Sequence, residues 1–136
     1  MEQYVKQRPL AVTLLALLVL TFTVMNAVRF GAALAFWDIL LQYAPRPGPI
    51  YVAASGLIWA LAGLPLCWGL WTGRRWAQLA SALALGLFTA YYWTDRQLFQ
   101  SVRANGLFAL VVNLVLLIFA SLTLLGAGSF FSQRKT

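Results

Sequence analysis

The sequence predicts an all-α integral membrane protein: a four-helix bundle with a short interfacial helix between spans 1 and 2. Hydrophobic residues make up 62% of the 136 positions and charged residues only 10%, whereas a soluble domain carries roughly 25% charged residues. A soluble fold of this size has too little interior to cover so much apolar surface. The apolar residues also gather into four uncharged runs, each long enough to cross a hydrocarbon core. We therefore expect a single membrane domain over residues 1–136.

Span 1 is predicted at residues 10–28. Lys6 and Arg8 precede it, and Pro9 suits the first turn of a helix, where its missing N–H costs nothing. Basic residues before an apolar run also fit a secretory signal peptide, with residues 33–35, Ala-Leu-Ala, as a cleavage site. The apolar core of a signal peptide is shorter, about 7–15 residues. We therefore expect an uncleaved anchor.

Residues 30–43, which follow Arg29, form an apolar segment that is too short to cross a membrane. Two interpretations stay open. The segment is either an interfacial helix, with Trp37 at headgroup depth and Asp38 in water, or an extension of the first helix beyond the membrane. Three prolines within residues 45–49 end any helix that reaches them.

Three further spans are predicted at residues 50–70, 76–93 and 107–125. Pro65 predicts a kink in span 2. Residues 72–75, Thr-Gly-Arg-Arg, form a tight basic turn, so spans 2 and 3 are expected to be antiparallel neighbours.

Basic residues set the expected orientation. The side of the two termini carries six, Lys6, Arg8, Arg74, Arg75, Arg134 and Lys135, and the other side carries four, Arg29, Arg46, Arg96 and Arg103. This bias predicts a multi-pass protein of the cell membrane with both termini in the cytoplasm. The same side chains are expected to contact anionic lipid headgroups. No polar segment carries a basic stripe with interleaved aromatic residues, so nucleic acid is not an expected partner.

Two stripes of small residues predict how helices pack. They comprise Ala53, Gly56, Ala60 and Gly63 in span 2, and Ala82, Gly86 and Ala90 in span 3. Small side chains let two helix backbones approach closely within a membrane. Because spans 2 and 3 are joined by a short turn, the two stripes are expected to face each other.

The composition argues against catalysis. The chain has no histidine and one cysteine, Cys67, which excludes Ser/His/Asp catalysis, bis-histidine haem ligation, most zinc and copper sites, and dithiol exchange. No charged residue lies in the central two-thirds of any span, which disfavours a proton-coupled antiporter. We predict no catalytic residue, no metal ligand and no cofactor.

The best candidate for a functional surface is the place where residues 30–43 meet the outer ends of the spans. Its predicted members are Asp38, Trp37, Arg29, Asn26 and Asn113. Asp38 either pairs with an arginine or lies on a solvated face. Asn26 and Asn113 are expected to bond each other or a neighbouring backbone carbonyl. The adjacent acid–base pair at residues 95 and 96 is expected in water at a helix end.

The opening of the first span, residues 8–16 (Arg-Pro-Leu-Ala-Val-Thr-Leu-Leu-Ala), resembles the start of uncharacterised small bacterial integral membrane proteins with three to four spans. The resemblance covers only the N-terminal helix. It implies a location in the bacterial inner membrane and carries no functional residues.

Two functions fit these features. The first is a protein that acts through helix–helix contacts, as a homo-oligomer or as an accessory subunit of a membrane complex. The alternative is a transporter or channel for a neutral or lipophilic small molecule, in which Ser55, Gly63 and Pro65 interrupt span 2 where a solute passes.

Overall fold

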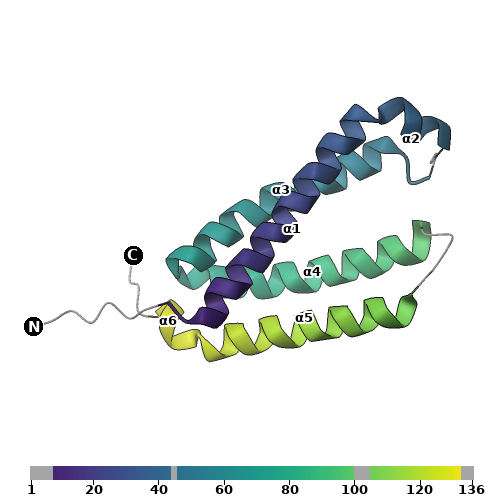
Figure 1. Ribbon diagram of the computed structural model, residues 1–136. Helices are drawn as coiled ribbons and strands as arrows, with labels where there is room; N and C mark the ends of the chain where they lie inside the picture. The colour runs from purple at the N-terminus through teal and green to yellow at the C-terminus, as the bar shows by residue number, and fades with distance from the viewer. Residues whose placement is uncertain (1–7, 44–45, 100–104, 133–136) are drawn as a thin grey trace, which may run out of the picture. The chain divides into compact units, whose positions relative to one another are not determined.

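The computed structural model describes residues 8–43, 46–99 and 105–132, and all regular secondary structure within them is helical. The helices, shown in Figure 1, are α1 (Leu10–Ala35), α2 (Trp37–Tyr43), α3 (Pro49–Thr72), α4 (Arg75–Phe99), α5 (Gly106–Gly126) and α6 (Gly128–Ser132). The all-α prediction is therefore confirmed for the described part of the chain.

Three helices, α1, α3 and α5, are long and apolar enough to cross a membrane. Helix α4 has 25 residues, which gives it a length of about 37 Å. It is not among the three because polar and aromatic side chains such as Gln78, Ser81 and Tyr92 lower its apolar character. A membrane protein is supported by this finding, whereas a fourth span at residues 76–93 stays a prediction.

The segment at residues 30–43 is divided between two helices. Helix α1 continues through Arg29 to Ala35, and the short helix α2 follows after Phe36. The Phe36 N–H donates to the Ala32 carbonyl and the Leu40 N–H donates to the Phe36 carbonyl. Arg29 does not end α1, because an arginine side chain leaves the helical hydrogen bonds of the backbone intact.

The chain divides into two compact units. The first unit comprises Met1–Ala16 and Trp68–Thr136, and the second unit comprises Leu17–Cys67.

In the second unit, α1 and α3 pack with their backbones in close contact. A Cβ atom placed on Gly56 would lie 2.9 Å from both the Asn26 carbonyl oxygen and the Phe30 nitrogen. A Cβ atom on Gly63 would overlap the side chain of Thr23. Because a later position of α3 meets an earlier position of α1, the two helices run antiparallel here.

In the first unit, α4 and α5 also run antiparallel. Gln78 Nε2 donates to the Leu124 carbonyl at 2.7 Å near one end of the pair. Trp93 Nε1 donates to Asn113 Oδ1 at 3.5 Å nearer the other end. The buried core of this unit includes Leu70, Ala77, Ala120, Leu124, Ala127 and Phe131.

A tight turn joins α3 to α4. Gly73 has a φ of 70°, a left-handed conformation that glycine adopts without steric cost. The Arg74 N–H donates to the Gly69 carbonyl at 2.9 Å and closes the end of α3. The ring of Phe130, from α6, lies 2.8 Å from the place where a Cβ of Gly73 would be. The turn and α6 therefore pack against each other.

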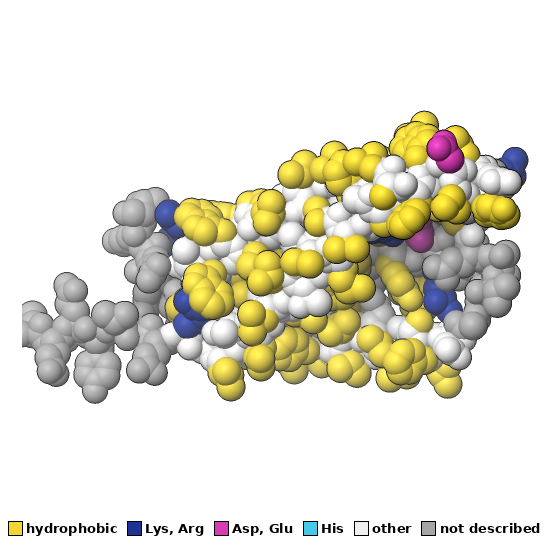
Figure 2. Space-filling model, turned by 45° about the horizontal axis from the view of Figure 1, so that its top comes forward, with side chains coloured by type: hydrophobic (Ala, Val, Ile, Leu, Met, Phe, Trp, Pro, Cys, Tyr) yellow, Lys and Arg dark blue, Asp and Glu magenta, His cyan; other side chains and the backbone are white. Residues whose placement is uncertain are grey.

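Hydrophobic side chains cover most of the visible helix surface in Figure 2. Many large ones are exposed, including Leu107, Leu122 and Leu125 on α5. Soluble monomers rarely leave so much contiguous apolar surface in water. The surface therefore fits helices that have lipid or other protein as their surroundings.

Candidate functional site

Four of the five residues of the predicted functional surface lie in the second unit. Asp38 is exposed in the first turn of α2, and the described residues give it no ion pair. Trp37 and Arg29 are partly buried, on α2 and α1 respectively.

The two asparagines have different partners. Asn26 is 8% exposed, and its Nδ2 donates to the Phe22 carbonyl of its own helix at 2.8 Å. This is one of the two kinds of bond that the sequence predicts. Asn113, in the first unit, accepts the Trp93 bond. Both side chains thus have partners that stabilise helices.

The small residues of α3 form a buried interface with α1. Ala53, Gly56, Ala60 and Gly63 are all buried. The polar groups along this interface bond to their own helices: Thr23 Oγ1 donates to the Val19 carbonyl at 2.7 Å, and Ser55 Oγ donates to the Val52 carbonyl at 3.2 Å. The sequence predicts that this stripe packs on residues 82–90, whereas the structure packs it on α1. The correction has a simple cause, since the spacing of small residues specifies close approach but not the partner helix.

The alternative function, a path for a neutral or lipophilic solute through span 2, stays a prediction. Helix α3 is continuous from Pro49 to Thr72 and includes Pro65. Gly63 lies against Thr23, and the hydroxyl of Ser55 bonds its own backbone. Gly63 and Ser55 are thus buried residues of a continuous helix, whereas Pro65 is exposed.

The small residues of α4 are, by contrast, exposed. Ala82, Gly86 and Ala90 all lie on the surface, and a Cβ on Gly86 would meet no atom within 4 Å in the rest of the described chain. Leu79, Leu83 and Leu87 flank them and are each at least 60% exposed. Residues three and four apart share one side of a helix, so these six form one surface. We call it the open face of α4; its members are Leu79, Ala82, Leu83, Gly86, Leu87 and Ala90.

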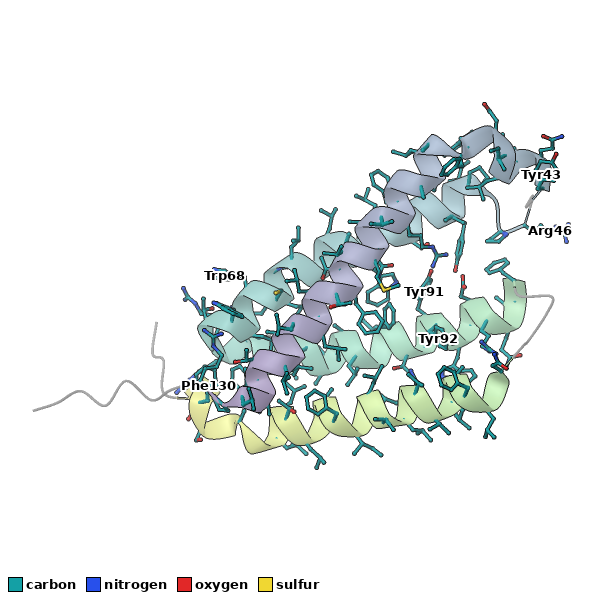
Figure 3. All side chains as sticks on the ribbon, viewed as in Figure 1. Tyr43, Arg46, Trp68, Tyr91, Tyr92 and Phe130 are labelled. Carbon is teal, nitrogen blue, oxygen red and sulfur yellow. The ribbon has the colours of Figure 1, made fainter. Side chains whose placement is uncertain are left out.

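A second feature of the first unit is a cluster of arginines and tryptophans at the α3–α4 turn. The Arg8 guanidinium carbon lies 3.9 Å from the centroid of the Trp71 ring, and that of Arg74 lies 5.0 Å from the centroid of Trp68. Arg75 donates to the Ser132 carbonyl through Nη2 at 2.6 Å and Nε at 3.2 Å. Figure 3 labels Trp68 and Phe130 at this end of the unit. The sequence marks these arginines only as topology signals, because no sequence pattern pairs them with particular rings.

The other end of α4 holds a buried arginine. Arg96 is 8% exposed, and its Nη1 lies 3.5 Å from the Tyr92 hydroxyl. The sequence places the Asp95-Arg96 pair in water, and this is wrong for the Arg96 side chain. The ring of Tyr92 contacts the ring of Trp93 edge to face. The Arg96 side chain is therefore buried, with the Tyr92 hydroxyl as one of its neighbours.

No protein-family model, curated protein or solved structure matches the chain. Within the described residues there is also no group of three His, Cys, Asp or Glu side chains that would hold a metal ion. The candidate surfaces are the open face of α4, which is defined by the exposure of its side chains, and the arginine–tryptophan cluster, which is defined by its side-chain contacts.

Proposed function

We propose that the protein acts through helix–helix contacts in the cell membrane, as a homo-oligomer or as an accessory subunit of a membrane complex, and that the open face of α4 is its contact surface. One observation carries the proposal. Two stripes of small residues occur in the chain. Within the second unit, that of α3 is filled by α1, while within the first unit that of α4 is exposed, and a Cβ on Gly86 would meet no atom of this unit within 4 Å beyond its own helix backbone.

In a bilayer, a helix face with small residues at its centre favours contact with another helix. Lipid tails are as apolar as leucine, so burial alone does not bring helices together in a membrane. Association depends on van der Waals contact between closely packed backbones, which small residues permit. At the centre of the open face, Gly86 presents bare backbone to a partner, and the flanking leucines supply contact area around it.

The composition of α4 supports the same role. It is the least apolar of the four long helices and the one that composition alone does not identify as a span. Its polar side chains are already turned inward, since Gln78 donates to the Leu124 carbonyl and Ser81 is buried, and the open face is left with apolar side chains for contact with another helix. With α4 as a fourth span, the chain forms a four-helix membrane protein with both basic termini on the cytoplasmic side.

Helix α5 offers a useful contrast. Its exposed side chains are large and branched, among them Val111, Leu114, Val115 and Ile118. Such side chains hold two backbones apart and suit a face that contacts lipid tails. Positions on α5 are therefore the natural controls for positions on α4.

Energy transfer between labelled copies in liposomes tests self-association. We expect wild-type transfer to fall as lipid dilutes the protein. Gly86→Leu should abolish transfer, because its side chain fills the centre of the face, and helicity should not change, because this position contacts no other part of the described chain. Ile118→Ala serves as the control and should leave transfer unchanged. If both variants associate like the wild type, the open face is not the contact surface.

An accessory subunit would give a different pattern. The protein alone would then stay monomeric in liposomes, and the partner would be found only in native membranes. A cross-linked product of fixed mass that contains a second, different protein, formed from α4 positions and absent from α5 positions, would identify this second form of the proposal. If native membranes yield neither product, both forms fail.

A further inference from the structure

We propose that the α3–α4 turn and α6 form a binding site for the phosphate of an anionic phospholipid. The site consists of the arginine–tryptophan cluster of the first unit: Arg8, Trp68, Trp71, Arg74 and Arg75. This inference goes beyond the proposed function, since it concerns a lipid headgroup and a surface separate from the open face of α4.

The two stacked arginines leave their donors available. In Arg8 and Arg74, an indole ring lies under the guanidinium group at 3.9 and 5.0 Å. No described residue accepts a hydrogen bond from either side chain. A ring beneath the guanidinium carbon attracts the cation, and the N–H edges of the group stay available to an acceptor. The distance between two N–H groups on such an edge matches the distance between two phosphate oxygens.

The surroundings of the two arginines are held in place. Arg75 anchors the last residue of α6 through its two bonds to the Ser132 carbonyl. The Phe130 ring packs on Gly73 at the turn and contacts the ring of Phe131, which is buried. The start of α4 and the short helix α6 therefore contact each other directly beside Arg74.

The positive charge of this cluster is uncompensated within the described chain. The sequence has three acidic residues. Glu2 lies outside the described residues, and Asp38 belongs to the second unit. Asp95 is twenty positions beyond Arg75 on the same helix, about 30 Å away at the rise of an α-helix. Within the described residues of the first unit, therefore, no carboxylate competes with an anion for the three guanidinium groups.

The aromatic residues indicate a lipid as the source of this anion. Trp68, Trp71 and Trp76 are about half exposed and lie at the joined ends of α3, a candidate membrane span, and α4. Tryptophan prefers the headgroup level of a bilayer. Guanidinium groups stacked on these rings lie at the same depth as lipid phosphates, and the cytoplasmic leaflet is rich in anionic lipid.

The test measures lipid preference. The full-length protein is placed in nanodiscs that contain phosphatidylglycerol and phosphatidylcholine, is then extracted in neutral detergent, and its retained lipids are counted by native mass spectrometry. We expect wild-type protein to retain phosphatidylglycerol in preference. Arg74→Gln should lower that preference about fivefold, the effect of one basic side chain at an anionic surface. The matched control is Arg46→Gln, which removes an exposed arginine from the second unit (Figure 3) and should not lower the preference.

A second variant separates a built site from diffuse attraction. Trp71→Leu keeps every charge and removes the ring under Arg8, so the preference should fall although the net charge is unchanged. Circular dichroism and gel filtration confirm that each variant is folded. The proposal is overturned if the wild type shows no preference, if Arg46→Gln acts like Arg74→Gln, or if Trp71→Leu has no effect. Displacement of the lipid by inorganic phosphate would assign the site to a soluble anion instead and would also overturn it.

Discussion

Gly56 lies at a place in the second unit where the packing leaves no room for a larger side chain. The helix backbones of α1 and α3 approach here until only a hydrogen atom fits between them, since a Cβ would lie 2.9 Å from two backbone atoms of α1. Backbone cannot rotate away as a side chain can. A single methyl group must therefore move a whole helix.

We predict that Gly56→Ala lowers the free energy of unfolding by about 1–3 kcal/mol, the usual cost of adding a group to a well-packed core. Thermal melting in detergent, followed by circular dichroism, measures the change. Gly86→Ala is the matched control, because the methyl group there meets nothing within 4 Å in the described chain. Equal destabilisation by the two substitutions would contradict the close approach of α1 and α3.

Ser81 is a buried residue with an unsatisfied group. It is 7% exposed, and its Oγ has no hydrogen-bond partner among the described residues. A buried polar group without a partner costs about 1–3 kcal/mol. We predict that Ser81→Ala keeps or raises the melting temperature in detergent. A clear decrease would show that the hydroxyl group makes a stabilising bond.

At the scale of elements, the sequence predicts where helices lie better than it predicts what they contact. Predicted residues 50–70 and 107–125 fall within α3 and α5, because long apolar runs end at prolines, glycines and charges. The end of α1 differs: Arg29 closes the apolar run, but the helix continues to Ala35. A charged side chain makes water a better surrounding than lipid for that part of a helix, but it leaves the backbone hydrogen bonds of the helix unchanged.

Contacts between elements depend on information that local patterns do not contain. Small residues three or four apart occur in both α3 and α4, yet the first stripe is buried and the second is exposed. One arginine–tryptophan pair joins residues 8 and 71, which are far apart in the chain. Burial of Arg96 likewise depends on contacts that its place in the sequence does not specify. These features of the candidate surfaces could not be predicted from the sequence.

The α3–α4 turn makes an element-scale prediction. Gly73→Ala places a Cβ in a left-handed residue and against the Phe130 ring. We expect a loss of about 1–2 kcal/mol from the backbone conformation and faster hydrogen exchange in α6, measured by mass spectrometry. Gly128→Ala is the control, because its nearest contact would be Gln78 Nε2 at 4.0 Å. Unchanged exchange in α6 after Gly73→Ala would show that the turn does not hold this helix.

At the scale of the whole molecule, the number of membrane spans decides on which side of the membrane α6 lies. If α4 crosses the membrane, α6 lies on the same side as the N-terminus; if it does not, they lie on opposite sides. We predict that Ser129→Cys, in a Cys67→Ala background, reacts with a membrane-impermeant maleimide only after cells are permeabilised. Gln42→Cys, next to Tyr43 on α2, should react in intact cells. Both positions are exposed. Labelling of Ser129→Cys in intact cells would contradict four spans with cytoplasmic termini.

The central claim is that α4 contacts another helix through its open face, and cross-linking in native membranes from single cysteines that carry a photo-activated group tests it most directly. Single cysteines are introduced at Ala82, Gly86 and Ala90, with Ile118 on α5 as the control, all in the Cys67→Ala background. The account predicts a cross-linked product of one fixed mass from the α4 positions and none from position 118. Cross-linking at position 118 alone, equal yields at all four positions, or no product at any of them would contradict it.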